Sequence, residues 1–457
     1  MVFPIAGGTQ DTGYEISNSL RFNDGDSANL SRSISSSGSN TNASISFWLK
    51  RGTAFGSQQI LFTNVKTDYY FRVALDSSAR LEIIDVTNGS VSGKRVTNRL
   101  FRDPSAFYHI FIGVDGGQGT EENRVKVYIN GVAETSWSSE TAWQSTFQMN
   151  ADDLTHYVGQ RGDSNQYFDG YMSEFNYVDG TTKAYTDFGE FNDNGVWIPK
   201  KYTGSYGTNG FFLEFQQTGT SQNSSVIGAD TSGQDNHFAV SNLAATDVTV
   251  DTPTNNFCTG NPIAKYINDT NVTFSEGNVK GVAGAVATSY NFLGTFGSAN
   301  MNFYFEAKAT NVDQNNDTRI GVVPVDSTAG IAINGEHNQV VYRGDGSVVS
   351  TGETALTSQG NITDGMMVGV AVDPDNNVKW YLNGTLTSTQ SINSTYRGPV
   401  YMPYFRHVNS GTVEFNFGNP SFSISSGNSD ANGYGNFEYS VPSGYYALCT
   451  KNLAEYG

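Results

Sequence analysis

The chain has 457 residues, of which only 15% are charged, and Asp and Glu outnumber Lys and Arg by 44 to 26. The resulting net charge of −18 repels phosphate backbones, so we expect no nucleic-acid partner. No run of eighteen apolar residues occurs, so we expect no insertion into a membrane. The length predicts two to three domains, and 50 Gly with 25 Tyr and 29 Phe favours an all-β chain rich in turns.

Residues 1–18 are predicted to form an extended N-terminal arm, because Gly, Thr and Pro are frequent there. No basic segment precedes an apolar one in this arm, so we expect no secretory signal peptide. Cys258 and Cys449 are the only cysteines, and their spacing fits neither a disulfide framework nor a metal site. Both observations favour synthesis in a reducing cytoplasm.

Residues 19–200 contain short alternating strands separated by turn residues, which is typical of a sandwich. The expected strands are 19–23, 43–50, 59–62, 69–75, 80–84, 108–115, 125–129, 156–159 and 168–175. Asn130-Gly131 follows the strand 125–129 and predicts a tight hairpin turn with the glycine at positive φ.

The same order of features recurs later in the chain. Val368–Asp373 and a polar loop precede Val378-Lys-Trp-Tyr-Leu-Asn-Gly384, just as 108–115 and a loop precede Val125-Lys-Val-Tyr-Ile-Asn-Gly131. The repeat predicts a second sandwich over residues 263–457. Residues 201–262 are interpreted as a connector with one or two strands, although an edge strand for the first sandwich or the start of a second sandwich remains open.

Two families resemble these segments. Residues 43–50, 107–115, 125–131, 157–159 and 168–175 are similar to the successive strands of laminin-G-like, concanavalin A-type jelly rolls. Residues 302–308, 319–323, 364–373, 378–384 and 413–420 resemble the strands of SPRY domains, including a Phe-x-Phe-Gly ending before a proline. The resemblance implies two tandem concanavalin A-like sandwiches, laminin-G-like and then SPRY-like.

The two halves in this order, with the arm and the linker Pro253-Thr-Asn-Asn-Phe-Cys258, resemble structural proteins of marine tailed bacteriophages. This resemblance implies a virion component made in the host cytoplasm and released by lysis. Its partners would be other virion proteins, and we expect a homo-oligomer, with a trimer as the guess. Val2, Phe3, Pro4 and Ile5 are apolar without a core of their own, so they are the candidate residues for attachment to the particle.

Two tryptophans and four aspartates are candidate site residues. Trp137 and Trp143 lie in a Ser/Thr-rich segment and could stack on sugar rings, with core burial of at least one as the alternative. Asp152, Asp153, Asp163 and Asp169 could bind Ca²⁺, with ordinary turn chemistry as the alternative. No other cofactor is expected. Arg161-Gly162-Asp163 matches a cell-adhesion tripeptide, but its Gly/Asp-rich context favours a plain loop.

We expect no catalysis. Concanavalin A-like glycosidases need two carboxylates on one strand face, and Glu82 and Asp85 fall on opposite faces. The leading hypothesis is therefore a surface-exposed fibre or spike subunit whose lectin-like loops bind host-surface glycan. The alternatives are a capsid decoration or tail connector that binds only virion proteins and, with least support, a glycan-degrading depolymerase.

Overall fold

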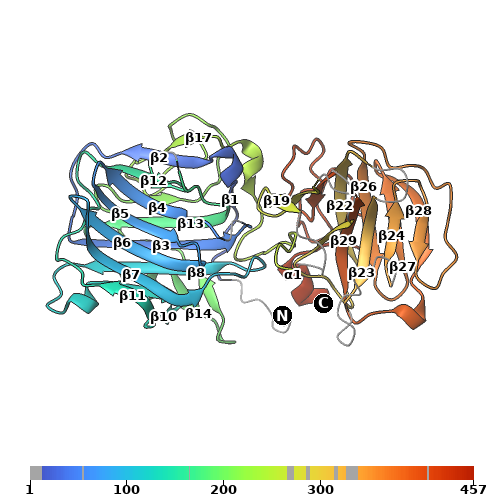
Figure 1. Ribbon diagram of the computed structural model, residues 1–457, viewed down its shortest axis with the longest axis horizontal. Helices are drawn as coiled ribbons and strands as arrows, with labels where there is room; N and C mark the ends of the chain where they lie inside the picture. Colours follow the sequence, from blue (N-terminus) through green and yellow to red (C-terminus); the bar gives the residue numbers. More distant parts are fainter. Residues whose placement is uncertain are drawn as a thin grey trace. The chain divides into compact units, whose positions relative to one another are not determined.

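The computed structural model describes residues 13–53, 56–163, 165–264, 272–284, 289–312, 318–325, 338–408 and 411–457 (Figure 1). The predicted attachment residues Val2, Phe3, Pro4 and Ile5 lie outside these ranges. The chain divides into two compact units, with the boundary between Thr254 and Asn255. Both units are built from β-sheets, which confirms the all-β prediction.

The first unit contains two eight-stranded antiparallel sheets. One sheet has the order β10-β9-β8-β3-β13-β1-β18, with β16 also paired to β13. Its strands are β1 (Ser19–Phe22), β3 (Asn42–Arg51), β8 (Tyr108–Asp115), β9 (Val125–Ile129), β10 (Val132–Ala133), β13 (Gly170–Asp179), β16 (Phe211–Leu213) and β18 (Val248–Thr249).

The other sheet of this unit has the order β11-β7-β6-β5-β4-β12-β2-β17. Its strands are β2 (Asn29–Ser33), β4 (Gln59–Lys66), β5 (Tyr69–Leu75), β6 (Arg80–Thr87), β7 (Ser90–Leu100), β11 (Trp137–Thr141), β12 (Thr155–Val158) and β17 (Ala239–Ser241). A separate hairpin pairs β14 (Gly189–Phe191) with β15 (Trp197–Pro199).

The core of the first unit lies between these two sheets. The rings of Phe47 on β3 and Phe175 on β13 stack with centroids 4.9 Å apart, and Phe62 on β4 meets Phe175 at 5.6 Å. All three side chains are fully buried. Because Phe62 and Phe175 come from different sheets, their contact fixes the sandwich packing.

The second unit also contains two sheets. The larger has the order β19-β20-β30-β22-β26-β27-β28 with β31 paired to β22, and the smaller has the order β21-β29-β23-β24-β25. The strands of the larger sheet are β19 (Thr273–Ser275), β20 (Lys280–Val282), β22 (Phe303–Thr310), β26 (Met367–Asp373), β27 (Asn377–Leu382), β28 (Thr385–Ser391), β30 (Thr412–Asn416) and β31 (Tyr446–Ala447). Those of the smaller are β21 (Ser289–Leu293), β23 (Arg319–Pro324), β24 (Val340–Arg343), β25 (Val348–Ser350) and β29 (Tyr401–Val408).

Contacts across the two sheets hold the second unit together. Phe405 of β29 meets Phe415 of β30 edge to face at 6.2 Å. The indole N–H of Trp380 on β27 donates to the carbonyl of Ile320 on β23 at 3.1 Å. One α-helix, α1 (Thr450–Tyr456), occurs in the described ranges, together with short 3-10 turns at 24–26, 121–123, 185–187, 245–247 and 394–396. No helix among the described residues is both long enough and apolar enough to cross a membrane.

The two predicted Asn-Gly hairpins are confirmed and closely alike. Asn130 and Gly131 have φ of 49° and 74°, and Asn383 and Gly384 have φ of 47° and 78°, as a primed turn requires. The side-chain oxygen of each asparagine accepts from the start of the neighbouring strand. His109 N donates to Asn130 Oδ1 at 2.7 Å, and Met367 N donates to the equivalent oxygen at 3.0 Å.

The segment interpreted as a connector belongs to the first unit instead. Three of its strands, β16, β17 and β18, pair with β13, β2 and β1. The buried ion pair between Lys50 and Asp251, at 2.9 Å, then fastens the end of the segment to β3. The sequence predicts one or two strands in this segment and leaves their pairing with the first sandwich open. The strands are only two or three residues long and gain their stability from distant partners, so the local pattern does not specify that pairing.

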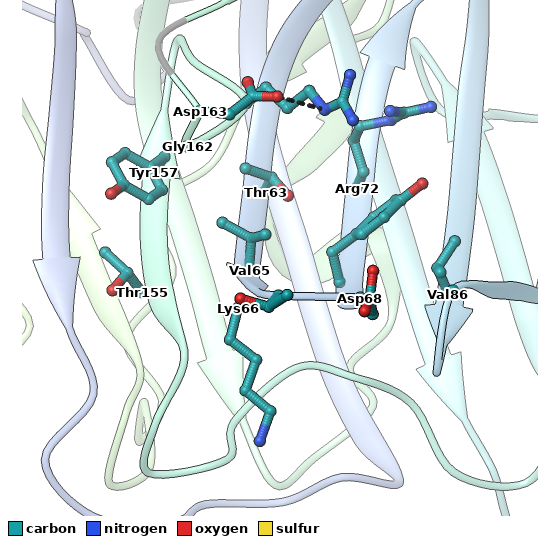
Figure 2. Close-up of a pocket in the computed structure, with 14 residues that line it drawn as sticks. Thr63, Val65, Lys66, Asp68, Arg72, Val86, Thr155, Tyr157, Gly162 and Asp163 are labelled. Carbon is teal, nitrogen blue, oxygen red and sulfur yellow. Dashed lines mark ion pairs between the residues drawn. The ribbon is translucent and has the colours of Figure 1, made fainter.

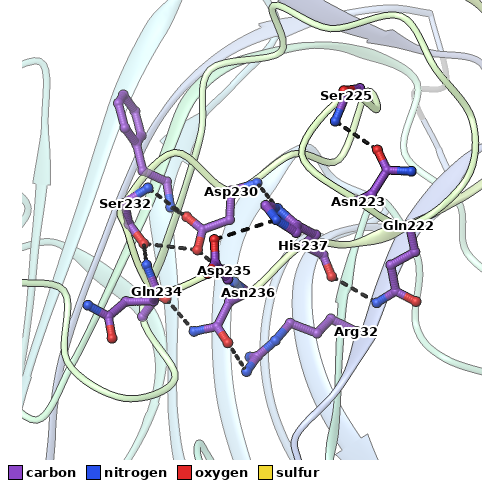
Figure 3. A network of polar contacts seen from close by, with 12 residues as sticks. Arg32, Gln222, Asn223, Ser225, Asp230, Ser232, Gln234, Asp235, Asn236 and His237 are labelled. Atoms are coloured by element: carbon purple, nitrogen blue, oxygen red, sulfur yellow. Dashed lines mark hydrogen bonds and ion pairs between the residues drawn. The ribbon is translucent and has the colours of Figure 1, made fainter.

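A polar network also ties residues 228–238 to the first unit (Figure 3). Asp230 accepts from the backbone N–H groups of Phe212 at 2.8 Å and Asn236 at 2.9 Å. Arg32 on β2 donates to the Asn236 side chain, and Asp230 N donates to His237 Nδ1 at 3.0 Å. The turn therefore serves to dock this segment on β2 and β16.

The second unit begins before residue 263. Phe257 forms an isolated antiparallel β-bridge with Cys449, and Cys258 N donates to the Leu448 carbonyl at 3.0 Å. Both cysteines are buried, and neither forms a disulfide. Residues 250–262 are thus anchored on both sides of the Thr254–Asn255 boundary, each side to its own unit.

Candidate functional site

The candidate site lies on the outer face of the sheet that contains β12, β4, β5 and β6. Successive strand residues point to opposite faces. Phe62, Phe71 and Val158 belong to the core between the sheets. Their neighbours on β4, β5 and β12 therefore point away from that core.

Strand register places these outward side chains in two rows across the sheet. The rows are Tyr157–Thr63–Arg72 and Thr155–Val65–Tyr70. In both rows the β4 residue, Thr63 or Val65, has a short side chain. Tyr157 of β12 stands on one side of β4, and Arg72 and Tyr70 of β5 stand on the other. A trough therefore runs along β4, with walls on β12 and β5 about 10 Å apart, two strand spacings.

The trough, here called the β4 groove, is a cavity of about 490 Å³ (Figure 2). This volume falls within the range of small-molecule sites. Each end has a cation and a carboxylate. Lys66 and Asp68 lie at the β4–β5 turn, and Asp163 lies at the opposite end, where it pairs with Arg161.

Arg72 is the most deeply buried charge of the groove, with 7% of its surface exposed. Its Nη2 donates to Glu82 Oε1 at 2.6 Å, and its guanidinium lies 5.4 Å from the centre of the Tyr70 ring. Its Nε has no hydrogen-bond partner among the described residues. Glu82 also accepts from Gln58 at 2.8 Å and pairs with Lys94 at 3.6 Å, so two cations share one carboxylate.

The ion pairs at the two ends are open to solvent. Lys66 pairs with Asp153, which lies outside the groove, and Arg161 pairs with Asp163 at 3.4 Å. Exposed pairs of this kind contribute roughly 0–1 kcal/mol. Their donors and acceptors can therefore turn to a ligand at little cost.

The two predicted tryptophans do not line the groove. Trp143 is 1% exposed and packs in the core against Phe147, which corrects its assignment as a glycan contact. The room for its indole comes from Gly93, where a Cβ would come within 2.1 Å of the ring. Trp137 is half-buried on β11 beneath the Arg95 guanidinium, 4.8 Å from the ring centre.

The four predicted calcium ligands are not brought together. Asp169 is buried and accepts from Thr53 N at 2.5 Å, whereas Asp152 and Asp153 are exposed and Asp163 lies in the groove. In the described part of the chain, no three or more His, Cys, Asp or Glu residues form a group that could hold a metal ion. Asp169 instead accepts a hydrogen bond from the backbone of a loop, as Asp commonly does in turns.

The structure also brings together two carboxylates that sequence reasoning missed. A bulge in β13 places Glu174 at φ 51°, where its side chain accepts from Tyr14 Oη at 3.0 Å. Burial, and then the nearby charge of Glu214, raises the pKa of Glu174 to about 8. Glu214 pairs with Lys201 at 3.6 Å. Neither glutamate lines the β4 groove, and no sequence signal marks the bulge.

Glu82 and Asp85 do lie on opposite faces of β6, as expected. Glu82 faces the groove side and pairs with Arg72. Asp85 accepts from Gln148 N at 2.7 Å, and burial raises its pKa to about 6. These two carboxylates therefore cannot flank one glycosidic bond.

Comparison with known proteins gives the first unit a family likeness. Residues 22–186 match the family model described as the concanavalin A-like lectin/glucanases superfamily, in its laminin-G form. A comparison with curated proteins finds no match.

Solved structures that match part of the chain include a pentraxin and two SPRY domains. A native heptameric SAP-like pentraxin from Limulus polyphemus is 13% identical, with 38% of this chain and 80% of that chain covered and a TM-score of 0.28. The SPRY domain of human HERC1 is 16% identical, with 30% and 86% covered and a TM-score of 0.24. Another human SPRY domain is 12% identical, with 34% and 98% covered and a TM-score of 0.27. The family likeness of the chain therefore rests on residues 22–186, which are similar to concanavalin A-like domains of the laminin-G type.

Proposed function

We propose that the first unit binds carbohydrate in the β4 groove, and that the chain is a surface-exposed fibre or spike subunit of a phage virion that contacts host glycan. The groove carries the binding part of this proposal. The resemblance of the whole sequence to phage structural proteins supports the virion part.

The groove has the chemistry that sugars need. Tyr157 and Tyr70 supply ring faces on opposite walls, against which the apolar faces of a sugar can pack. Carboxylates and basic groups at both ends supply acceptors and donors for hydroxyl groups. A groove along a strand also suits an extended oligosaccharide better than a compact ligand.

A glycan array tests this assignment. The intact chain should bind a defined set of saccharides, and Tyr157→Ala should lose binding because one stacking wall is gone. Tyr396→Ala is the matched control, because Tyr396 is an exposed tyrosine of the second unit. Equal binding by both variants would move the site away from the groove.

We propose that the bound glycan is not cleaved. In the groove, Asp68 and Asp163 stand at opposite ends, which does not suit the paired carboxylates of a glycosidase. A reducing-sugar assay on a bound saccharide checks this. Product formation that Asp163→Asn or Asp68→Asn abolishes would establish a depolymerase.

A second candidate is a decoration or connector protein that binds only other virion proteins. Phe191 and Val196, 50% and 56% exposed, flank the β14–β15 turn and offer an apolar contact. Replacing both with serine should block incorporation into particles while glycan binding persists. Mass spectrometry of purified virions measures incorporation of that variant and of the unaltered chain.

Assembly into a homo-oligomer through the N-terminal arm remains part of the proposal, with a trimer expected. Weak single sites gain avidity when several copies are linked. The deletion that tests the arm should end at residue 12, because Tyr14 donates to Glu174 within the first unit. The truncated chain should fold and yet fail to enter particles, as measured by light scattering and virion mass spectrometry.

A further inference from the structure

We propose that the saccharide held in the β4 groove is acidic and that its carboxylate or sulfate binds Arg72. This inference rests on the proposed glycan-binding function and names the ligand class.

Arg72 is positioned to receive an anion. It stands next to Thr63 in the row that begins with Tyr157, and more than nine-tenths of it is buried. Its Nε carries a proton that no described residue accepts. A buried N–H group without a hydrogen-bond partner lowers the stability of the fold. A charged acceptor relieves that free-energy cost more than a hydroxyl does.

The neighbours of Arg72 leave positive charge beside the groove. Glu82 is the carboxylate that pairs with Arg72, and it is shared with Lys94. Tyr70 lies beneath the guanidinium and restricts its movement without neutralising it. The guanidinium therefore retains attraction for a second oxyanion. This local positive charge contrasts with the net charge of the chain, −18.

The two carboxylates of the groove do not compete for this place. Asp163 is already paired with Arg161, and Asp68 lies at the far end beside Lys66 (Figure 2). Both can accept hydrogen bonds from the hydroxyl groups of neighbouring sugar units. The arrangement thus places one negative charge beside Arg72 and neutral hydroxyls near Asp163 and Asp68.

Three polymers separate the sources of the anion: polygalacturonate carries carboxylates, dextran sulfate carries sulfates, and dextran is neutral. Binding of each to the full chain is measured by biolayer interferometry at two salt concentrations. We expect at least one acidic polymer to bind about tenfold or more tightly than dextran. Arg72→Met should remove that difference, and Arg72→Lys should restore part of it, because it keeps the charge but not the Nε donor.

Arg99→Met is the charge-matched control, because Arg99 pairs with Glu134 and does not line the groove. Arg72→Met leaves Glu82 with Lys94 and Gln58, so the variant should fold, which circular dichroism verifies. If Arg72→Met and Arg99→Met weaken binding of the acidic polymers equally, the cause is the change in net charge, and the inference is overturned.

The remaining outcomes distinguish the two proposals. Equal binding of all three polymers that Arg72→Met leaves unchanged and Tyr157→Ala abolishes would overturn the acidic ligand but retain the groove. Binding of acidic polymers that survives both Tyr157→Ala and Arg72→Met would overturn both proposals. Absence of binding to any saccharide, on these polymers and on the array, would also overturn both.

Discussion

Gly131 and Gly195 allow a clean test of what holds the repeated hairpin in place. Both glycines have φ of 74°, so alanine at either position meets the same backbone strain, about 1–2 kcal/mol. Their surroundings differ. A Cβ at Gly195 meets nothing within 4 Å, whereas a Cβ at Gly131 would lie 2.2 Å from Cε3 of Trp197.

The ring of Trp197 cannot easily retreat. It is buried, and its indole N–H donates to His109 Nδ1 at 3.0 Å. Displacing it by more than 1 Å should add about 1–3 kcal/mol, as overpacking typically does. Gly195→Ala should therefore lower the free energy of unfolding by about 1–2 kcal/mol, and Gly131→Ala by about 2–5 kcal/mol.

Differential scanning calorimetry of the full chain measures both variants. Gly384→Ala provides an internal comparison, because its Cβ would lie 2.3 Å from the Tyr439 ring in the second unit. We expect Gly131→Ala to shift the first unit's transition and Gly384→Ala to shift the second unit's transition. Equal shifts for Gly131→Ala and Gly195→Ala would refute the role assigned to the tryptophan.

Three further predictions follow from other contacts. Lys50→Met breaks the buried ion pair with Asp251, so urea denaturation should show a loss of about 3–5 kcal/mol in the free energy of unfolding. A second change, Asp251→Leu, should largely restore it, and no recovery would argue against the pair. Burial raises the pKa of Glu174 from 4.5 to about 8, so its contribution to stability is full below pH 4.5 and is lost as pH rises to about 8. Glu174→Gln should flatten the fall in melting temperature across that window, and an unchanged slope would contradict the raised pKa. Limited proteolysis should cut first near Thr254 and Asn255 and leave two resistant fragments, whereas early cuts within either unit would contradict the division.

Features governed by local chemistry were predictable from the sequence. The Asn-Gly turns follow from residues that tolerate positive φ next to alternating strands, and both appear as predicted. Glu82 and Asp85 point to opposite faces of the sheet because side chains alternate between the two faces along β6. The all-β class follows from composition and from the short spacing of turn residues.

Features that depend on distant pairing were not predictable. The β4 groove exists because Tyr157 is in register with Thr63, and no local pattern fixes that alignment. Trp143 is buried because Gly93, far away in the sequence, leaves room for its indole. Of the predicted site residues that the structure describes, only Asp163 lines the groove, and the sequence favours calcium binding there rather than a sugar contact.

A crystal structure of the chain bound to its tightest saccharide tests the central claim most directly. The account predicts a sugar ring along β4, packed against Tyr157 or Tyr70, with an acidic group within hydrogen-bonding distance of the Arg72 guanidinium. A saccharide bound elsewhere, for example on Trp137 at the sheet edge, with the groove holding only water, would contradict it.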